Sequence, residues 1–489
     1  MEFNSLVEAV AYWAEKTPEK VCLIEAESGK TSTYSQFWNR ALHFGARLRN
    51  NGLNKGERVV VRVTQGIDTL IAAFGIYAAG GIYVPIAKKI GEERIIELLE
   101  YFDARCFVAL TPVEYDCEYI NIVEVYNGID NKYNGHIEFP DPDEVSDIIF
   151  TTGTTGMPKG VMRTYRGYCE AAKNRYGDIG FTNNDVFMYN NLQNVVGGIN
   201  SLRHSFPIGA TSVIGTGAIF VKDFWAYISK YRVTLLSLTP TELSILLNAE
   251  MDIRQYCETL RVISLKAAAI NAQDIRKIKK VLPQTHIFSI YGTTEALPIC
   301  IYDITACEVV PLCIGKPSNE CFVRIVDEYG EKLESSSYSF PGFISCKTKS
   351  VMYGYWNAPT LTASVLKDGW LTLSDIGYID DAGFVYLMGR KDDVINTGGH
   401  KVAPIEIEEL TNEIEGIKEC ACISLPDKIM GYVPKLFVVM EEGADFSAKN
   451  IYKYLASKLE SYKLPRNIEQ LDKLPRTEGG MKILKRELR

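Results

Sequence analysis

The sequence predicts an α/β protein with a large N-terminal domain of two parallel-sheet α/β subdomains plus a small β-barrel-like subdomain, followed by a small α+β C-terminal domain. Up to about residue 310, short apolar strands alternate with helical segments, which is typical of parallel sheets covered on both faces. Beyond that point, short strands follow one another with turns between them. Helical patterns return after Asp392, so the domains are expected at residues 1–391 and 392–489.

The first part of the chain is expected to contain helices around a short strand pair, over residues 5–52. The apolar run from Leu70 to Ala87 is about as long as a membrane span of ~18 residues, but glycines and a proline interrupt it. We therefore predict a buried helix over 66–79 and a strand over 82–86. Further strands are predicted at 59–63, 106–110 and 120–123.

The same alternation recurs in the middle of the chain, where residues 185–215 are expected to form a strand, a helix and a strand. Parallel strands are also predicted at 234–238, 262–265 and 286–290. The β-rich part is expected to contain strands at 323–327, 342–348, 370–373 and 384–388. In the last domain, helices are expected at 404–413, at 447–461 and at the extreme end.

Composition excludes several classes of protein. Of 489 residues, 46% are hydrophobic and 23% are charged, which is ordinary for a globular protein and not for a disordered, collagen-like or coiled-coil chain. Lys and Arg total 53 against 61 for Asp and Glu, so the basic excess of a nucleic-acid binder is absent. The twelve cysteines lack zinc-ligand spacing, and the acidic N-terminus does not resemble a signal peptide. We expect a cytoplasmic protein with reduced thiols and with neither nucleic acid nor membrane as partner.

The strongest chemical signal is the run Ile149–Val161, in which an apolar segment leads into a loop of threonines and glycines that ends in a lysine. Glycines allow the backbone to approach an anion closely, and hydroxyl groups and an ammonium group supply further donors. The run is not a Walker A motif, because Pro158 precedes the lysine and Gly160 follows it. The residues predicted to bind phosphate are Thr151, Thr152, Gly153, Thr154, Thr155, Gly156 and Lys159.

This loop closely resembles the phosphate loop of the adenylate-forming superfamily, which includes acyl- and aryl-CoA synthetases, adenylation domains of peptide synthetases and beetle luciferases. Further motifs follow in the order of that family, and the resemblance extends from near Pro18 to the end of the chain. These motifs are Tyr291–Glu295, Leu373–Asp375, Gly389–Asp393, Gly398 and Gly399 with Pro404–Glu406, and Pro475–Thr477 with Gly480 and Lys482.

The resemblance implies a nucleotide site built from several of these motifs. Glu295 is a candidate Mg²⁺ ligand, since Mg²⁺ commonly takes one or two carboxylates plus phosphate oxygens. Thr294 would donate to the α-phosphate, and Tyr291, followed by Gly292 and Thr293, would stack on adenine. Asp375 is suited to accept the ribose hydroxyls, and Arg390 could reach the ribose or the phosphates.

The resemblance also implies that the C-terminal domain is a mobile lid with two working poses. Lys482 would neutralise the carboxylate and the α-phosphate during adenylation, with Lys485 as the alternative, because Met481 occupies the position where the family's lysine directly follows glycine. Asp392 matches the hinge position. In the second pose, Gly398 and Gly399 would face the site and line a pantetheine tunnel.

The acyl pocket is less defined by the sequence. Asn194 takes the position where the family usually has His, and Val195 occupies the place of the Asp that holds an α-ammonium group, so an α-amino acid substrate is not expected. Small residues leave space for an acyl or aryl group, although they could equally serve packing. The predicted pocket residues are Asn194, Gly197, Ala267, Ala268 and Ala269.

Together these observations predict an ATP-dependent ligase that forms acyl-AMP and pyrophosphate from a carboxylic acid. The acyl group would then pass to a pantetheine thiol. The expected cofactors are ATP, Mg²⁺ and CoA, with a carrier-protein phosphopantetheine as the alternative thiol. A nucleotide-binding homologue without ligase activity is the alternative from another class, because fold alone does not fix function.

Overall fold

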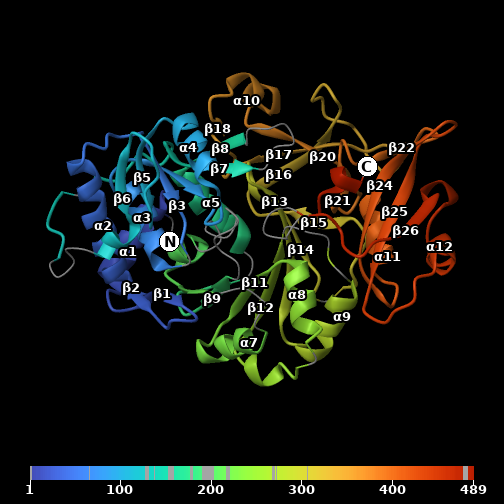
Figure 1. Ribbon diagram of the computed structural model, residues 1–489, viewed down its shortest axis with the longest axis horizontal. Coiled ribbons are helices and arrows are strands. Elements are labelled where there is room, and N and C mark those ends of the chain that lie inside the picture. Colours follow the sequence, from blue (N-terminus) through green and yellow to red (C-terminus); the bar gives the residue numbers. More distant parts are fainter. Residues whose placement is uncertain are drawn as a thin grey trace.

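The computed structural model describes residues 3–64, 66–126, 132–136, 138–151, 159–176, 180–189, 203–215, 221–249, 251–266, 270, 272–305, 307–476 and 483–488. In Figure 1 the N-terminal elements lie on the left, the middle of the chain lies below the centre, and the C-terminal elements lie on the right. The described elements form three sheets, of 14, 7 and 5 strands.

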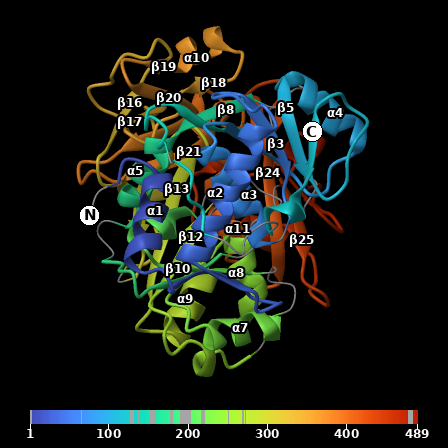
Figure 2. The same cartoon turned by 90° about the vertical axis from the view of Figure 1, so that its left-hand side faces the viewer.

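The seven-stranded sheet has the order β18-β8-β7-β4-β3-β5-β6 and is parallel from β7 to β6. Alternate residues of β3 reach opposite faces: Val59 and Val61 pack with helices α2 and α3, and Val60 packs with α4. Helices therefore cover both faces, as the apolar strands predict (Figure 2). The bounds are β3 Arg58–Arg62, β4 Ile82–Ile86, β5 Ala104–Ala109, β6 Glu118–Asn121, β7 Val145–Thr151, β8 Lys159–Thr164, β18 Gly354–Tyr355, α2 Tyr34–Asn50, α3 Ile67–Ala78 and α4 Glu92–Tyr101.

The second parallel region belongs to the 14-stranded sheet, in the order β13-β12-β11-β9-β10-β1, with β2 and β14 antiparallel at its two ends. One face shares the apolar core of α1, α2 and α3, and the other packs against α7, α8 and α9. The bounds are α1 Leu6–Lys16, β1 Val21–Glu25, β2 Thr31–Thr33, α5 Tyr165–Tyr176, β9 Val186–Tyr189, β10 Thr211–Ile214, α7 Val221–Lys230, β11 Leu235–Leu238, α8 Pro240–Leu247, β12 Val262–Lys266, α9 Ala272–Val281, β13 His286–Thr293 and β14 Leu297–Asp303.

The β-rich part continues the same sheet, because β14 pairs with β15. Its strands are antiparallel, and β16 also lies against β14 and β15, so this part curls back on itself. The bounds are β15 Cys313–Pro317, β16 Cys321–Val326, β17 Gly342–Thr348, α10 Pro359–Val365, β19 Leu366–Lys367, β20 Trp370–Ile379 and β21 Val385–Arg390.

The five-stranded sheet holds the last elements and has its own core, formed with α11 and α12. It also contacts the preceding part, because the hydroxyl group of Tyr338 donates to Glu406 (2.6 Å) and the N–H of Leu312 donates to Glu409 (3.0 Å). The bounds are β22 Ile395–Thr397, β23 His400–Val402, α11 Pro404–Thr411, β24 Ile417–Asp427, β25 Gly431–Met440, α12 Ala448–Ala456 and β26 Asn467–Gln470.

Most predicted elements are present, with shifted ends. The apolar run after Leu70 forms α3 and β4, as predicted, and among the described helices none has the length and apolar character required to cross a bilayer. The strand predicted at 370–373 extends to Ile379 because β21 continues to pair with it. The helix predicted at 447–461 ends at Ala456, and the expected terminal helix is a short 3₁₀ turn over Lys485–Leu488. The helix predicted within 185–215 falls largely on residues 190–202, which lie outside the described part of the chain; the described residues that follow form a 3₁₀ turn over Arg203–Ile208.

Candidate functional site

The predicted phosphate loop joins two antiparallel strands, β7 and β8. Thr151 ends β7 and lies opposite Lys159, the first residue of β8. Lys159 is exposed, and its ammonium nitrogen lies 5.6 Å from the centre of the Tyr355 ring. A cation at this distance from an aromatic ring is attracted to it, so Tyr355 helps to orient Lys159.

The turn between β13 and β14 carries the next predicted motif. Gly292 lies against the backbone of β14, and a Cβ atom at this position would overlap the carbonyl oxygen of Leu297. Leu297 itself has a positive φ of 57°. The tight turn therefore requires glycine, which explains its place in the motif. It projects Thr294 and Glu295 beyond the end of the parallel strand β13.

The carboxylate of Glu295 is linked to the start of β8 by Tyr355. The Tyr355 hydroxyl donates to Oε1 of Glu295 at 3.0 Å, while the ring of the same tyrosine lies beside Lys159. Burial, together with the neighbouring carboxylate, raises the pKa of Tyr355, so the phenol stays protonated and can donate. Tyr355 thus lies beside both Lys159 and Glu295, which the sequence assigned to phosphate and to metal.

A second link joins Tyr291 of β13 to Asp375 of β20. The Tyr291 hydroxyl donates to Oδ2 of Asp375 at 2.7 Å, and burial followed by this carboxylate raises the pKa of the phenol well above its usual value. Asp375 lies opposite Arg390 in the pairing of β20 with β21, and Arg390 is exposed. Tyr291 and Asp375 therefore meet at the carboxyl end of β13, the edge where open α/β sheets bind ligands.

The oxygen atoms that the β13–β14 turn offers are of the kind that Mg²⁺ binds. Its Oε2 atom accepts no hydrogen bond from a described residue, and the buried hydroxyl oxygen of Thr293 has no hydrogen-bond partner among those residues either. These are hard oxygen donors. In the described part of the chain, no three His, Cys, Asp or Glu side chains cluster as a metal site.

Several predicted residues lie outside the described part of the chain. For Thr151 only the backbone is described. The others outside it are Thr152, Gly153, Thr154, Thr155, Gly156, Asn194, Gly197, Ala267, Ala268, Ala269 and Lys482. The phosphate-loop tip, the acyl pocket and the catalytic lysine therefore stay predictions.

Lys485, the alternative catalytic lysine, is bound inside the C-terminal domain. Its ammonium nitrogen lies 2.6 Å from Oε1 of Glu408. Burial alone would lower the pKa of Lys485, but the Glu408 carboxylate outweighs burial and raises it. Asp392 and Gly398 are exposed, and Asp392 lies between the last strand of one sheet, β21, and the first strand of the next, β22.

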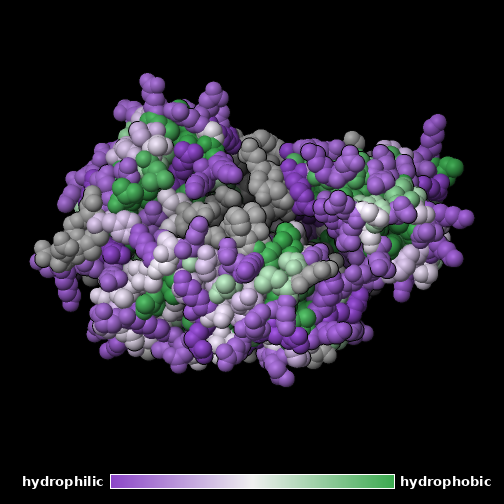
Figure 3. Space-filling view, turned by 60° about the horizontal axis from the view of Figure 1, so that its bottom comes forward, coloured by the Kyte–Doolittle hydropathy of each residue, from purple (hydrophilic) through white to green (hydrophobic). Residues whose placement is uncertain are grey.

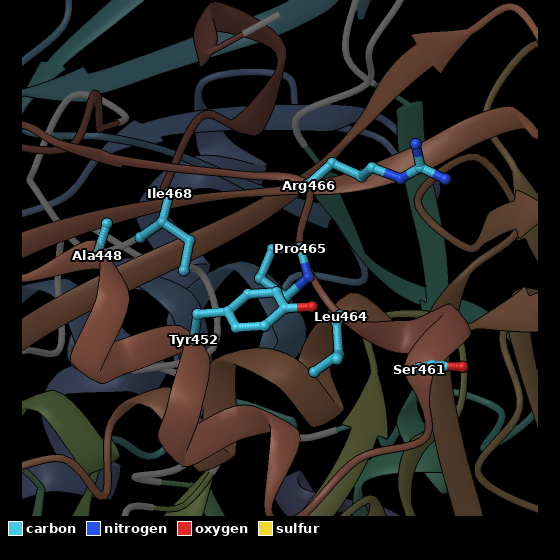
Figure 4. A pocket seen from close by; sticks show the side chains of 7 residues that line it. All are labelled: Ala448, Tyr452, Ser461, Leu464, Pro465, Arg466 and Ile468. Atoms are coloured by element: carbon cyan, nitrogen blue, oxygen red, sulfur yellow. The ribbon is translucent and has the colours of Figure 1, made fainter.

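A separate cavity lies on the C-terminal domain, between α12 and β26 (Figure 4). The rings of Tyr452 and Pro465 line it together with Leu464 and Ile468, and Arg466 points away from the apolar side chains. No predicted site residue lines this cavity. The face shown in Figure 3 is mostly hydrophilic, with small hydrophobic patches.

Comparison with known proteins assigns the family. Residues 10–356, well over half of the chain, match the model for the AMP-binding enzyme, and residues 406–480 match the AMP-binding enzyme C-terminal domain. The chain belongs to the AMP-binding enzyme family. The predicted membership in the adenylate-forming superfamily is confirmed.

Relatives of this chain include several CoA ligases. The long-chain-fatty-acid–CoA ligase of Bacillus subtilis is 29% identical, covering 97% of this chain and 92% of the relative. The 4-chlorobenzoate–CoA ligase of an Arthrobacter species is 28% identical, covering 99% and 94%. The 2-succinylbenzoate–CoA ligase of Bacillus cereus is 27% identical, covering 97% and 96%.

Solved structures confirm the predicted fold class. The O-succinylbenzoate coenzyme A synthetase of Bacillus subtilis in complex with AMP superposes with a TM-score of 0.86, at 25% identity, over 98% of this chain and 97% of the other. ATP-bound MatB of Rhodopseudomonas palustris gives a TM-score of 0.87, at 23% identity, over 99% and 98%.

Two residues of this AMP-binding enzyme's site are absent from the sequence predictions. Tyr355 stands in an ordinary Gly-Tyr-Trp run, and only the pairing of β18 with β8 brings it to Glu295. Arg163 could have been predicted from the sequence. Val161 and Arg163 are both buried on the same face of β8, and a buried charged residue requires a partner. Its partners are the carbonyl groups of Thr294 and Glu295.

Proposed function

We propose that this protein is an ATP-dependent acid–thiol ligase that activates a carboxylic acid and transfers it to CoA. In the first half-reaction, a carboxylate oxygen attacks the α-phosphorus of ATP, and pyrophosphate leaves as acyl-AMP forms. In the second, the thiol sulfur attacks the acyl carbon, the thiol gives up its proton, and AMP leaves. The CoA ligases among the relatives support this thiol acceptor.

The observation that carries this proposal is the gathering of Tyr291, Asp375 and Glu295 at one end of β13, with Lys159 tied to Glu295 through Tyr355. Adenylation brings two anions together, so its main difficulty is repulsion between charges. The site supplies a carboxylate for a metal and a cation close to one another. Bound Mg²⁺ would neutralise phosphate charge, and Glu295 and Thr293 are the residues proposed to face it.

The catalytic cation is proposed to be Lys482. The ammonium group of Lys485 is half-buried and is already paired with the Glu408 carboxylate. We propose further that residues 1–391 form the body and 392–489 the rotating domain, with Asp392 as the hinge. Its exposed position between two sheets suits a residue that must change its backbone angles.

The acid is proposed to enter a pocket formed by Asn194, Gly197 and Ala267–Ala269. These residues follow the carboxyl ends of β9 and β12, on the same edge of the sheet as Tyr291. The strands β9, β11, β12 and β13 are parallel, so their carboxyl ends share this edge. The pocket would therefore open beside the nucleotide.

The test is a screen of purified protein for pyrophosphate release with aliphatic, aromatic and dicarboxylic acids, with ATP and Mg²⁺. The best acid is then incubated with CoA or with a phosphopantetheinylated carrier protein, and the thioester is detected by mass. We expect acid-dependent pyrophosphate release and acyl-CoA. Thioester on the carrier alone would move the assignment to a carrier-loading ligase. ATP binding without exchange for any acid would instead indicate a nucleotide-binding homologue.

A further inference from the structure

Arg163 is a fully buried arginine on the inner side of β8, with 0% of its surface exposed. Its Nη1 atom donates to the carbonyl oxygen of Thr294 at 3.3 Å and to that of Glu295 at 3.2 Å. Both acceptors belong to the turn that carries the proposed metal ligand. One nitrogen with two hydrogens thus binds two consecutive peptide groups.

The turn is held on its inner side at every peptide from Thr294 to Ala296. The N–H of Met352 also donates to the Glu295 carbonyl at 2.6 Å, and the hydroxyl of Ser350 donates to the Ala296 carbonyl at 2.9 Å. The Glu295 carboxylate, in contrast, is held from β18 by Tyr355. Backbone and side chain of Glu295 are therefore fixed by separate elements.

The charge of Arg163 is not explained by packing. Its Nε and Nη2 atoms are buried without a hydrogen-bond partner among the described residues. Burial lowers the pKa of Arg163, and Tyr168, Asp147 and Glu295 oppose this effect in part. An apolar side chain of similar volume would fill the space at a smaller desolvation cost. A buried cation close to the turn attracts anions, such as the phosphate groups of ATP, to this end of the site.

We propose that Arg163 is a positioning residue for adenylation: it fixes the Thr294–Glu295 turn and keeps a positive charge on its inner side, so that Glu295 and Thr294 are set for magnesium-bound ATP. This inference rests on the proposed function. Arg163 acts through Glu295 and Thr294 rather than on the reacting atoms. Groups that orient a metal ligand commonly change metal affinity or activity by about 10–100-fold when they are removed.

Three substitutions separate geometry from charge. Arg163→Lys keeps the positive charge, Arg163→Gln keeps a nitrogen with two hydrogens and loses the charge, and Arg163→Met keeps neither. Ile148→Val is the control, because Ile148 is buried on the neighbouring strand β7 in a different apolar cluster. It loosens the same β7–β8 hairpin without touching the turn.

The first measurement is equilibrium binding of ATP without acid, at increasing Mg²⁺ concentration. We expect Arg163→Met to need about 10–100-fold more Mg²⁺ for half-maximal binding, with the lysine or glutamine variant between it and the wild type. In ATP–pyrophosphate exchange, kcat should fall while the KM for the acid stays constant. The control variant should match the wild type in Mg²⁺ dependence, even where its Tm falls.

The inference is overturned if folded Arg163→Met shows the wild-type Mg²⁺ dependence. If Arg163→Met does not fold, the lysine and glutamine variants decide, and wild-type Mg²⁺ dependence in both overturns it. Failure of the proposed function looks different, because the wild-type protein itself would then show no acid-dependent exchange.

Discussion

The hydroxyl group of Tyr291 donates a 2.7 Å hydrogen bond to Oδ2 of Asp375, which lies 84 residues further along the chain. The bond joins the last parallel strand of the central sheet to the antiparallel β-rich part. It fixes the ring proposed to stack on adenine and the carboxylate proposed to bind the ribose relative to each other. Two halves of the proposed nucleoside site thus depend on one contact.

Replacement of Tyr291 by Phe is expected to weaken nucleotide binding. The ring remains for stacking, but the Asp375 carboxylate loses the hydroxyl group that donates to it. Because a hydrogen bond to a carboxylate is a strong one, the KM for ATP should rise about tenfold. Steady-state kinetics with varied ATP measures this. Tyr386→Phe is the matched control, because its hydroxyl donates to Asp380 at 3.0 Å in a turn away from the site. Equal effects of the two variants would contradict the assigned role of Tyr291.

The two C-terminal lysines are expected to respond differently to substitution by Ala. Lys482→Ala should reduce ATP–pyrophosphate exchange by about 100-fold or more, because it removes the cation at the reacting centre, while ATP binding stays nearly unchanged. Lys485→Ala should keep exchange and destabilise the C-terminal domain by about 1–2 kcal/mol, because the Glu408 carboxylate loses its half-buried partner. Exchange assays and denaturant unfolding measure the two effects. Unimpaired exchange in Lys482→Ala would reverse the assignment.

Asp392→Pro is expected to impair thioester formation more than adenylation. Proline fixes φ, so it restricts the backbone change that the second pose of the lid requires. The two half-reactions are measured separately, by pyrophosphate exchange and by transfer of preformed acyl-AMP to CoA. Asp381→Pro, at another exposed aspartate in the turn between β20 and β21, should leave both rates unchanged. Equal losses in both half-reactions of Asp392→Pro would count against the hinge.

The sequence predicts the parallel sheets well because strands buried on both faces form continuous apolar runs. It also marks Tyr291, Glu295 and Asp375, because each stands in a short motif after a strand. Contacts between motifs could not be predicted from the sequence, because they depend on which strands pair. Tyr355 reaches Glu295 only because β18 pairs with β8, and the strand that carries Asp375 extends to Ile379 only because β21 pairs with it.

Glu409 is expected to make the stability of the protein depend on pH. Burial raises the pKa of its carboxyl group from 4.5 to about 8, with a lowering contribution from the Leu312 N–H that donates to it and raising contributions from Glu408, Glu406 and Glu413. Between pH 4.5 and about pH 8, Glu409 therefore keeps its proton in the folded protein, whereas it has lost the proton in the unfolded chain. Stability from this group is full below pH 4.5 and is lost as the pH rises through about 8.

Glu409→Gln should remove this dependence, because glutamine is neutral at every pH and still offers an oxygen to the Leu312 N–H. One pKa unit corresponds to about 1.4 kcal/mol, so the wild-type free energy of unfolding should fall by a few kcal/mol between pH 5 and pH 8, and that of the variant should fall less. Urea unfolding at several pH values measures both. Glu415→Gln, at an exposed glutamate close by, should follow the wild type. If the wild type and Glu409→Gln have parallel profiles, Glu409 is ionised in the folded protein at neutral pH, and the contact with Leu312 binds a carboxylate rather than a carboxylic acid.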